Sequence, residues 1–249
     1  MKLANIYPIA NHHLYQAESY VMILAHLVKQ GLYDPQYFSK EQYIIMDNGL
    51  YEGAQVSTSL QDCIDLAEAS GIPVSEIIVP DVVNDLESNI EMFESNIETI
   101  KKWQHKYRFM FVAQAANVSE LLYALKYIER HHDLNLSVGI SKLSKWDRAD
   151  AAAVRAYGRC SFPIHFLGIK TTFAELLPVC RLIRGCDTSQ VAFLDKNCVK
   201  FTSDLHLIAY QREGEDIDLE KDVCDTSVML YHKEHMLRGF QKLNVEVDA

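Results

Sequence analysis

Short apolar runs recur along the chain, and each one ends at a polar or glycine-containing stretch. Runs of this length, bounded by turn residues, are typical of buried strands. The predicted strands are Leu3–Ile9, Tyr43–Met46, Glu76–Val79, Arg108–Ala113, Leu136–Val138, Pro163–Leu167 and Leu182–Cys186.

The segments between these runs carry apolar residues at helical spacing. The predicted helices are Ser19–Gln30, Ser59–Ser70, Leu86–Lys106, Val118–His131, Trp146–Tyr157 and Phe173–Ile183, with Ser57, Asn117 and Thr171 or Thr172 as N-caps. Strands that alternate with helices indicate βαβ units and a parallel sheet. The spacing favours a closed (β/α)8 TIM-type barrel over an open sheet, with the eighth strand expected within Gln190–Tyr210.

The C-terminal part has a different composition. The stretch Gln211–Asp225 is strongly acidic and predicts a solvated loop, and an amphipathic helix follows it. We therefore expect one domain, with a catalytic barrel over residues 1–210 and an acidic loop and C-terminal helix over residues 211–249 that packs on the barrel.

Composition narrows the class of protein. The 249 residues are 49% hydrophobic, without an apolar stretch of the roughly 20 residues that a membrane span needs. The N-terminus lacks the pattern of a signal peptide, so we expect a cytoplasmic protein, in the host cytoplasm if it is phage-encoded. The formal charge of −10 argues against non-specific coating of nucleic acid.

The six cysteines contain no Cys-x-x-Cys pair. This argues against a disulfide framework and a compact zinc site. A looser metal set drawn from Cys180, Cys186, Cys198 and one histidine has poor spacing for zinc. We expect neither a metal nor another cofactor.

Polar residues stand where the predicted strands end, which in a barrel is where active sites form. They are Asp47, Asp81, Gln114, Gly139, Gly168 and Asp187, with Asn48 and Glu52 just beyond the first of them. Any one of the aspartates could instead be a turn former or an N-cap. Three carboxylates that converge on one mouth repel one another unless a ligand, metal or shared proton holds them, so the set as a whole predicts a site.

The usual motifs of dinucleotide, P-loop, zincin and α/β-hydrolase sites do not occur in the chain. Carboxylates beside an amide suit a purine, because Asp accepts from the N–H groups of guanine and Gln donates to its carbonyl. A further carboxylate can attack a sugar carbon and hold it covalently, as in a retaining glycosidase.

Six short motifs, in this order, resemble the strand-end motifs of the tRNA-guanine transglycosylase superfamily. They are "IIMDNG", "IIVPDVV", "FVAQAA", "SVGIS", "HFLGI" and "IRGCDTS", over roughly residues 40–195. The forms "MDNGLYE" and "DTS" resemble most the 7-deazaguanine DNA transglycosylases of phages and bacterial genomic islands. The zinc subdomain of the tRNA enzymes has no counterpart here.

The resemblance implies an exchange of guanine in DNA for a 7-deazaguanine base. Asp187 would be the nucleophile, with Asp195 as its rival, and Asp47 the general acid/base. Asp81 and Gln114 would hold the purine, and Asn48 and Glu52 would flank Asp47. Gly139 and Ile140 would complete the pocket, whose floor would be Leu167 and Gly168.

Contact with DNA needs positive charge that the chain as a whole lacks. We predict either a basic rim at the mouth or an accessory protein that supplies DNA affinity. The rim would consist of Lys142, Lys145, Arg148, Lys170, Arg181 and Arg184. The sequence leaves the oligomeric state open, including a homodimer, and predicts no membrane partner.

Two other functions stay open at this stage. The first is a metal-dependent barrel hydrolase, with His12, His13, Asp47, Asp81 and His165 as ligands. The second is a non-catalytic barrel that assists a nucleic-acid enzyme; the retention of three strand-end carboxylates speaks against it.

Overall fold

The computed structural model describes residues 1–48, 59–143, 146–169, 172–199, 203–205, 214–215 and 217–247. Glu52, Lys145 and Lys170, which the sequence assigns to the site or to its rim, lie outside these residues.

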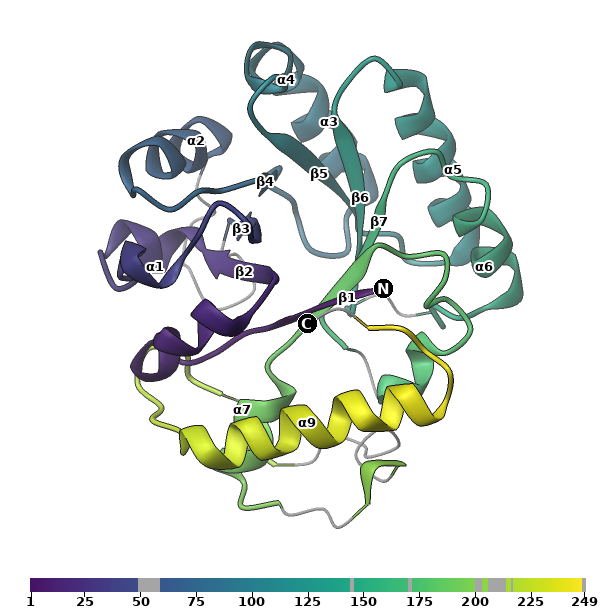
Figure 1. Ribbon diagram of the computed structural model, residues 1–249. Coiled ribbons are helices and arrows are strands. Elements are labelled where there is room, and N and C mark those ends of the chain that lie inside the picture. The colour runs from purple at the N-terminus through teal and green to yellow at the C-terminus, as the bar shows by residue number, and fades with distance from the viewer. Residues whose placement is uncertain are drawn as a thin grey trace.

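The chain forms a parallel eight-stranded barrel (Figure 1). Its sheet runs in the order β1-β8-β7-β6-β5-β4-β3-β2, and β1 contacts β2 to close the circle. The strands are β1 Lys2–Asn5, β2 Tyr20–Leu24, β3 Tyr43–Asp47, β4 Glu76–Ile78, β5 Arg108–Ala113, β6 Leu136–Ser141, β7 Ile164–Leu167 and β8 Gly185–Thr188. The predicted TIM-type barrel is confirmed.

One strand was misplaced by the sequence analysis. The segment Tyr20–Leu24, predicted as the start of a helix, is β2, and the eighth strand expected within Gln190–Tyr210 does not start there, because Gln190–Lys196 is helix α7. All five residues of β2 are buried, so its pattern lacks the polar alternation that marks a strand. Asp47 is consequently on the third strand instead of the second.

Most predicted helices are present. They are α1 Ala25–Lys29, α2 Leu60–Ala69, α3 Leu86–Ser95, α4 Ile97–Trp103, α5 Val118–Ile128, α6 Ala151–Tyr157 and α9 Thr226–Lys242, with 3-10 turns η1 Ile9–Ala17, η2 Pro35–Tyr37, η3 Glu129–His131 and η4 Phe173–Leu176. Asn117 and Thr172 cap as predicted, each accepting a backbone N–H. The helix predicted over Phe173–Ile183 is only the short η4, followed by turns that lead into β8.

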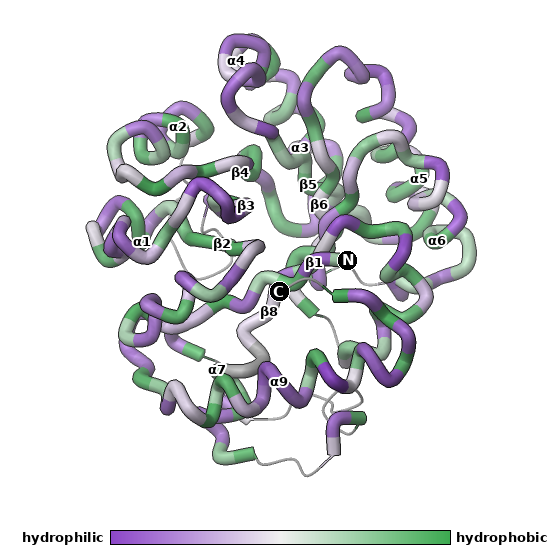
Figure 2. The backbone as a smooth tube through the Cα atoms, in the orientation of Figure 1, coloured by the Kyte–Doolittle hydropathy of each residue, from purple (hydrophilic) through white to green (hydrophobic). Residues whose placement is uncertain are grey.

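The side chains of each strand alternate between two apolar layers, one inside the barrel and one between the strands and the helices. Ala4, Met22, Ile45, Met110 and Val112 fill part of the barrel interior, and their neighbours along each strand pack beneath the helices. Figure 2 shows the hydrophobic colour along the central strands and more hydrophilic residues on the surrounding helices. This alternation leaves only a few interior positions for polar side chains, and the site is built from those.

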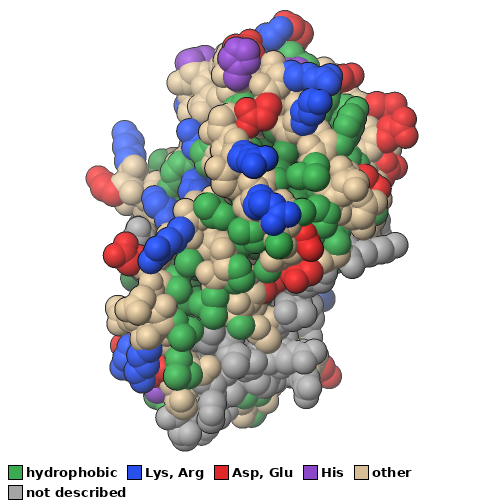
Figure 3. All heavy atoms as spheres, turned by 90° about the vertical axis from the view of Figure 1, so that its right-hand side faces the viewer, with side chains coloured by type: hydrophobic (Ala, Val, Ile, Leu, Met, Phe, Trp, Pro, Cys, Tyr) green, Lys and Arg blue, Asp and Glu red, His purple; other side chains and the backbone are tan. Residues whose placement is uncertain are grey.

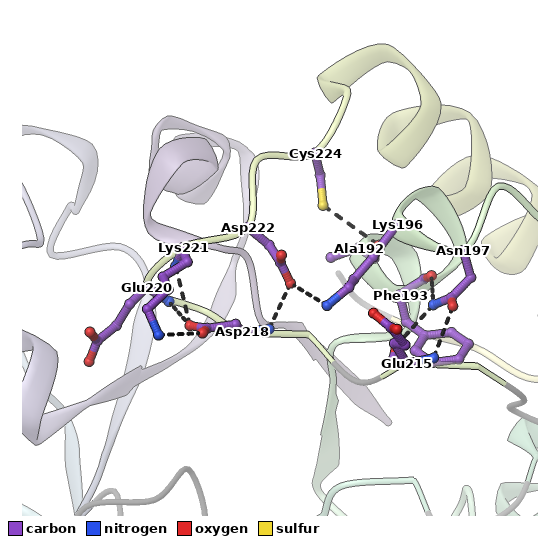
Figure 4. A network of polar contacts seen from close by, with 10 residues as sticks. All are labelled: Ala192, Phe193, Lys196, Asn197, Glu215, Asp218, Glu220, Lys221, Asp222 and Cys224. Atoms are coloured by element: carbon purple, nitrogen blue, oxygen red, sulfur yellow. Dashed lines mark hydrogen bonds and ion pairs between the residues drawn. The ribbon is translucent and has the colours of Figure 1, made fainter.

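The described part of the acidic stretch is a largely exposed loop, as its composition predicts, and hydrogen bonds attach it to α7. Lys196 of α7 forms an ion pair with Asp222 at 2.9 Å (Figure 4). The side-chain amide of Asn197 donates to the backbone carbonyl of Glu215 and accepts from its backbone N–H, both at 3.0 Å. Helix α9 packs against α7, so the C-terminal segment completes the outer layer of the barrel.

The side of the molecule that carries α5 and α6 has a mixed surface (Figure 3). Leu122 and Tyr123 of α5 are exposed there, and Lys126, Arg155 and Arg159 lie along the shallow groove between the two helices. Among the described residues, no helix is long and apolar enough to cross a membrane.

Candidate functional site

A pocket opens where the strands end, on the face of the barrel where the sequence placed a site. Its empty volume, including the open mouth, is about 580 Å³. The described residues that line it are Met22, Asp47, Asn48, Ile78, Asp81, Val83, Val112, Gln114, Ser141, Lys142, Leu143, Leu167, Gly168 and Asp187. The three predicted aspartates and Gln114 therefore share one small cavity.

Asp81 is held by two amides from neighbouring strands. Asn48, after β3, donates to Oδ1 at 3.1 Å, and Gln114, after β5, donates to Oδ2 at 2.6 Å. Burial raises the pKa of Asp81, while the hydrogen bonds from Gln114 and Asn48 act in the opposite direction. The two bonds fix the carboxylate before any ligand arrives, which suits the recognition of N–H groups.

Asp187 is buried at the end of β8, and two donors converge on its Oδ1. The backbone N–H of Gly168 donates at 3.0 Å, and His165 Nε2 lies at 3.0 Å. Gly168 has φ +68°, a conformation that favours glycine, and a Cβ there would come within 2.5 Å of Cδ of Lys142. The turn after β7 thus depends on glycine to bring its N–H to the carboxylate.

His165 continues from Asp187 into a polar chain that crosses the barrel interior. Its Nδ1 lies 2.8 Å from the Tyr20 hydroxyl, which accepts from Arg184 Nε at 3.1 Å. Arg184 also pairs with Glu76 at 2.6 Å. Tyr20 and Glu76 were not among the predicted site residues. The signal for Glu76 was a charged residue at the start of a strand that is otherwise apolar and buried.

Gly139 and Ile140 were expected to complete the pocket, yet neither is among its lining residues. Gly139 faces the barrel interior, where a Cβ would lie 2.9 Å from both Leu167 and Met110. Ile140 is buried in the layer beneath the helices. The next residues of the chain, Ser141 to Leu143, line the pocket in their place.

Arg148 was predicted for a basic rim, and the structure contradicts this. Its side chain is fully buried and pairs with Glu175 at 2.7 Å, stacked 4.6 Å from the ring centroid of Phe166. It also donates to the carbonyls of Ile140 at 3.1 Å and Gly168 at 2.9 Å. Arg148 therefore braces the loops of the mouth from inside and cannot contact DNA.

The prediction is also wrong for Arg184 and Arg181, which lie away from the mouth. Arg184 directly precedes β8, so it lies at the opposite end of the barrel from the pocket, bonded to Glu76, Tyr20 and Tyr43. Arg181 lies at that same end, beside Met1 and Ile183. Of the predicted rim, only Lys142 lies at the pocket among the residues that the structure describes.

Asp195, the rival of Asp187, lies on α7 in the outer layer of the barrel. Its Oδ2 accepts from the backbone N–H of Asp225 at 2.7 Å, at the junction between α7 and α9. This contact gives Asp195 a structural role in joining the two helices, whereas Asp187 lines the pocket.

The ligand set of a metal hydrolase is not assembled in the described part of the chain. The rings of His12 and His13 pack on Tyr37, at centroid distances of 4.8 and 6.4 Å. His165 is occupied by Tyr20 and Asp187. Within the described residues, no three His, Cys, Asp or Glu side chains are arranged to hold a metal ion.

Comparisons with known proteins assign no family to the chain. No protein-family model matches the chain, and a search of curated proteins finds no match. Among solved structures, a phospho-2-dehydro-3-deoxyheptonate aldolase (DAHP synthase) from Thermotoga maritima has a TM-score of 0.49 and 10% identity, over 99% of this chain and 70% of that chain. The function is therefore argued from the site itself.

Proposed function

We propose that this barrel is a pentosyltransferase that exchanges guanine in DNA for a 7-deazaguanine base, as its strand-end motifs suggest. The observation that carries the proposal is the shared pocket, which brings Asp47, Asp81, Gln114 and Asp187 together from four different strands. A carboxylate fixed by two amides suits the purine, and a second, buried carboxylate suits the sugar.

The proposed reaction proceeds through two displacements at the sugar C1′. An oxygen of Asp187 attacks C1′ as the bond from C1′ to N9 of guanine breaks, and the departing base takes a proton from the general acid Asp47. The incoming 7-deazaguanine then loses its N9 proton to Asp47 and attacks C1′, which breaks the ester bond to Asp187. No external oxidant or cofactor is required for this balance.

The isolated chain presents little positive charge to DNA near the pocket. With Arg148 buried, and Arg184 and Arg181 at the far end of the barrel, three of the predicted rim cations lie away from a duplex bound at the pocket, and the net charge is −10. These facts favour the second of the two predicted arrangements, in which an accessory protein supplies the phosphate contacts. The guanine must then be extruded or taken from locally opened DNA.

The decisive experiment is covalent trapping. The protein is incubated with guanine-containing DNA and a 7-deazaguanine, with cell extract as a source of the accessory protein, and run on a denaturing gel. We expect a protein–DNA adduct that disappears in Asp187→Ala and persists in the matched control Asp195→Ala. An adduct with the reverse pattern would refute Asp187 as nucleophile, and labelled guanine that never leaves the DNA would refute the exchange itself.

A further inference from the structure

In the polar chain below Asp187, the chemistry of Arg184 determines which group donates each hydrogen bond. Arg184 has only N–H groups, so its Nε must donate to the Tyr20 oxygen at 3.1 Å. The Tyr20 hydroxyl is fully buried, and its remaining contact is His165 Nδ1 at 2.8 Å. Its proton therefore points to Nδ1, which must be the unprotonated nitrogen.

The same count of donors and acceptors shows which proton His165 Nε2 carries. A neutral His165 that accepts at Nδ1 carries its proton on Nε2, and that proton donates to Asp187 Oδ1 at 3.0 Å. A doubly protonated ring would need Tyr20 to accept twice, leaving the buried hydroxyl proton without an acceptor among the described residues, which is costly. Burial also raises the pKa of Tyr20 well above its usual value, so the hydroxyl keeps its proton.

The fold makes room for this chain. A Cβ at Gly185 would lie 2.8 Å from the Lys2 carbonyl and 2.9 Å from the Tyr20 ring, so β8 can pass that ring only with a glycine. Tyr43 stacks on Tyr20 at a centroid distance of 5.5 Å and donates to Glu76 at 2.8 Å. Arg184 donates to Tyr43 as well, at 3.0 Å. The guanidinium is thus fixed by three partners.

Both hydrogen bonds to Asp187 end on the same oxygen. Gly168 N and His165 Nε2 each contact Oδ1, and no hydrogen bond to Oδ2 is formed by the described residues. Since Oδ1 accepts two protons from the protein, its lone pairs are engaged. Oδ2 is the carboxylate oxygen that remains for a ligand.

We propose that His165 and Tyr20 are positioning residues: Arg184 and Tyr20 lock His165 as the neutral Nε2–H tautomer, and this tautomer orients Asp187 so that Oδ2 attacks the sugar. The second half of this statement rests on the proposed function. The first half concerns the protein alone and can be tested without substrate.

Nitrogen-15 NMR of the ten histidines tests the tautomer. The signal of His165 is assigned by its loss in His165→Gln. At neutral pH we expect a proton on Nε2 and none on Nδ1. Tyr20→Phe should shift the Nδ1 resonance and introduce the other tautomer, because the donor to Nδ1 is gone. The matched control Tyr43→Phe removes a hydroxyl that contacts Arg184 but not His165; because Glu76 and Tyr20 still hold the guanidinium, both resonances should stay unchanged.

A proton on Nδ1 in the wild-type protein, or equal spectra for Tyr20→Phe and Tyr43→Phe, would overturn the locked tautomer. The functional half is read from the trapping assay at saturating base. Tyr20→Phe should slow adduct formation by about tenfold or more with base affinity unchanged, while Tyr43→Phe stays within about twofold.

The two ways of failing are distinguishable. If the wild-type protein forms no adduct, the proposed function is refuted and Oδ2 loses its role, while the NMR spectra still decide the direction of the chain. If the adduct forms and both tyrosine variants form it equally fast, the positioning role is refuted and the transglycosylase proposal stands.

Discussion

Replacing Arg148 by Met tests the interior brace of the pocket. The guanidinium pairs with Glu175 at 2.7 Å, and the side-chain exposures are 0% for Arg148 and 9% for Glu175. Methionine removes the positive charge that pairs with Glu175 and the N–H groups that donate to the carbonyls of Ile140 and Gly168. Breaking a buried pair from one side costs about 3–5 kcal/mol.

That loss is a large share of the about 5–15 kcal/mol by which a domain of this kind is stable. Urea unfolding, followed by circular dichroism, measures it as a lower midpoint at unchanged slope. Should Arg148→Met not fold, Arg148→Lys keeps the charge without the planar fork and should lose about 1.5–3 kcal/mol. The exposed Arg155 on α6 is the matched control, and Arg155→Met should stay within about 0.5 kcal/mol.

The double variant Arg148→Met with Glu175→Leu separates pairing from packing. Because it removes both charges, it should be more stable than Arg148→Met alone. The reasoning is refuted if Arg148→Met unfolds within about 1 kcal/mol of the wild type, or if the losses of the two single variants simply add.

Three further substitutions follow from the same structure. Gly185→Ala overpacks the barrel against Tyr20 and should cost about 1–3 kcal/mol in urea unfolding; unchanged stability would mean that the ring has room. Gly168→Ala forces a left-handed residue at φ +68° and should cost about 1–2 kcal/mol, and it should slow adduct formation with Asp187, which a merely local strain would not do. Asp81→Asn concerns pH. The folded-state pKa of Asp81 is raised, so its contribution to stability is fullest below the unfolded pKa and is lost as pH rises through the folded one. Because asparagine does not ionise, the stability of the variant should rise relative to that of the wild type from acidic to neutral pH, and the variant should lose purine binding; an equal pH dependence in both proteins would contradict this.

The sequence determined the class of fold and the addresses of the main site residues. Apolar runs ended by polar residues are a local property, and Asp47, Asp81, Gln114 and Asp187 each follow such a run. Parallel strands in a barrel place these positions at one end, so their convergence in a single pocket could be predicted without coordinates. The strand β2 was missed because burial on both faces removes the alternation that identifies a strand.

Only the tertiary structure decided which charged residues are exposed and which are internal. Arg148 and Arg184 read along the chain as surface cations, yet Arg148 is buried and Arg184 is mostly covered, and each pairs with a glutamate that is distant in sequence, Glu175 and Glu76. His165, Tyr20 and Arg184 come from three separate segments, and no local pattern links them. Their order below Asp187 arises because closing the barrel brings β2, β7 and β8 around one interior, where a buried polar group is stable only when it finds a partner.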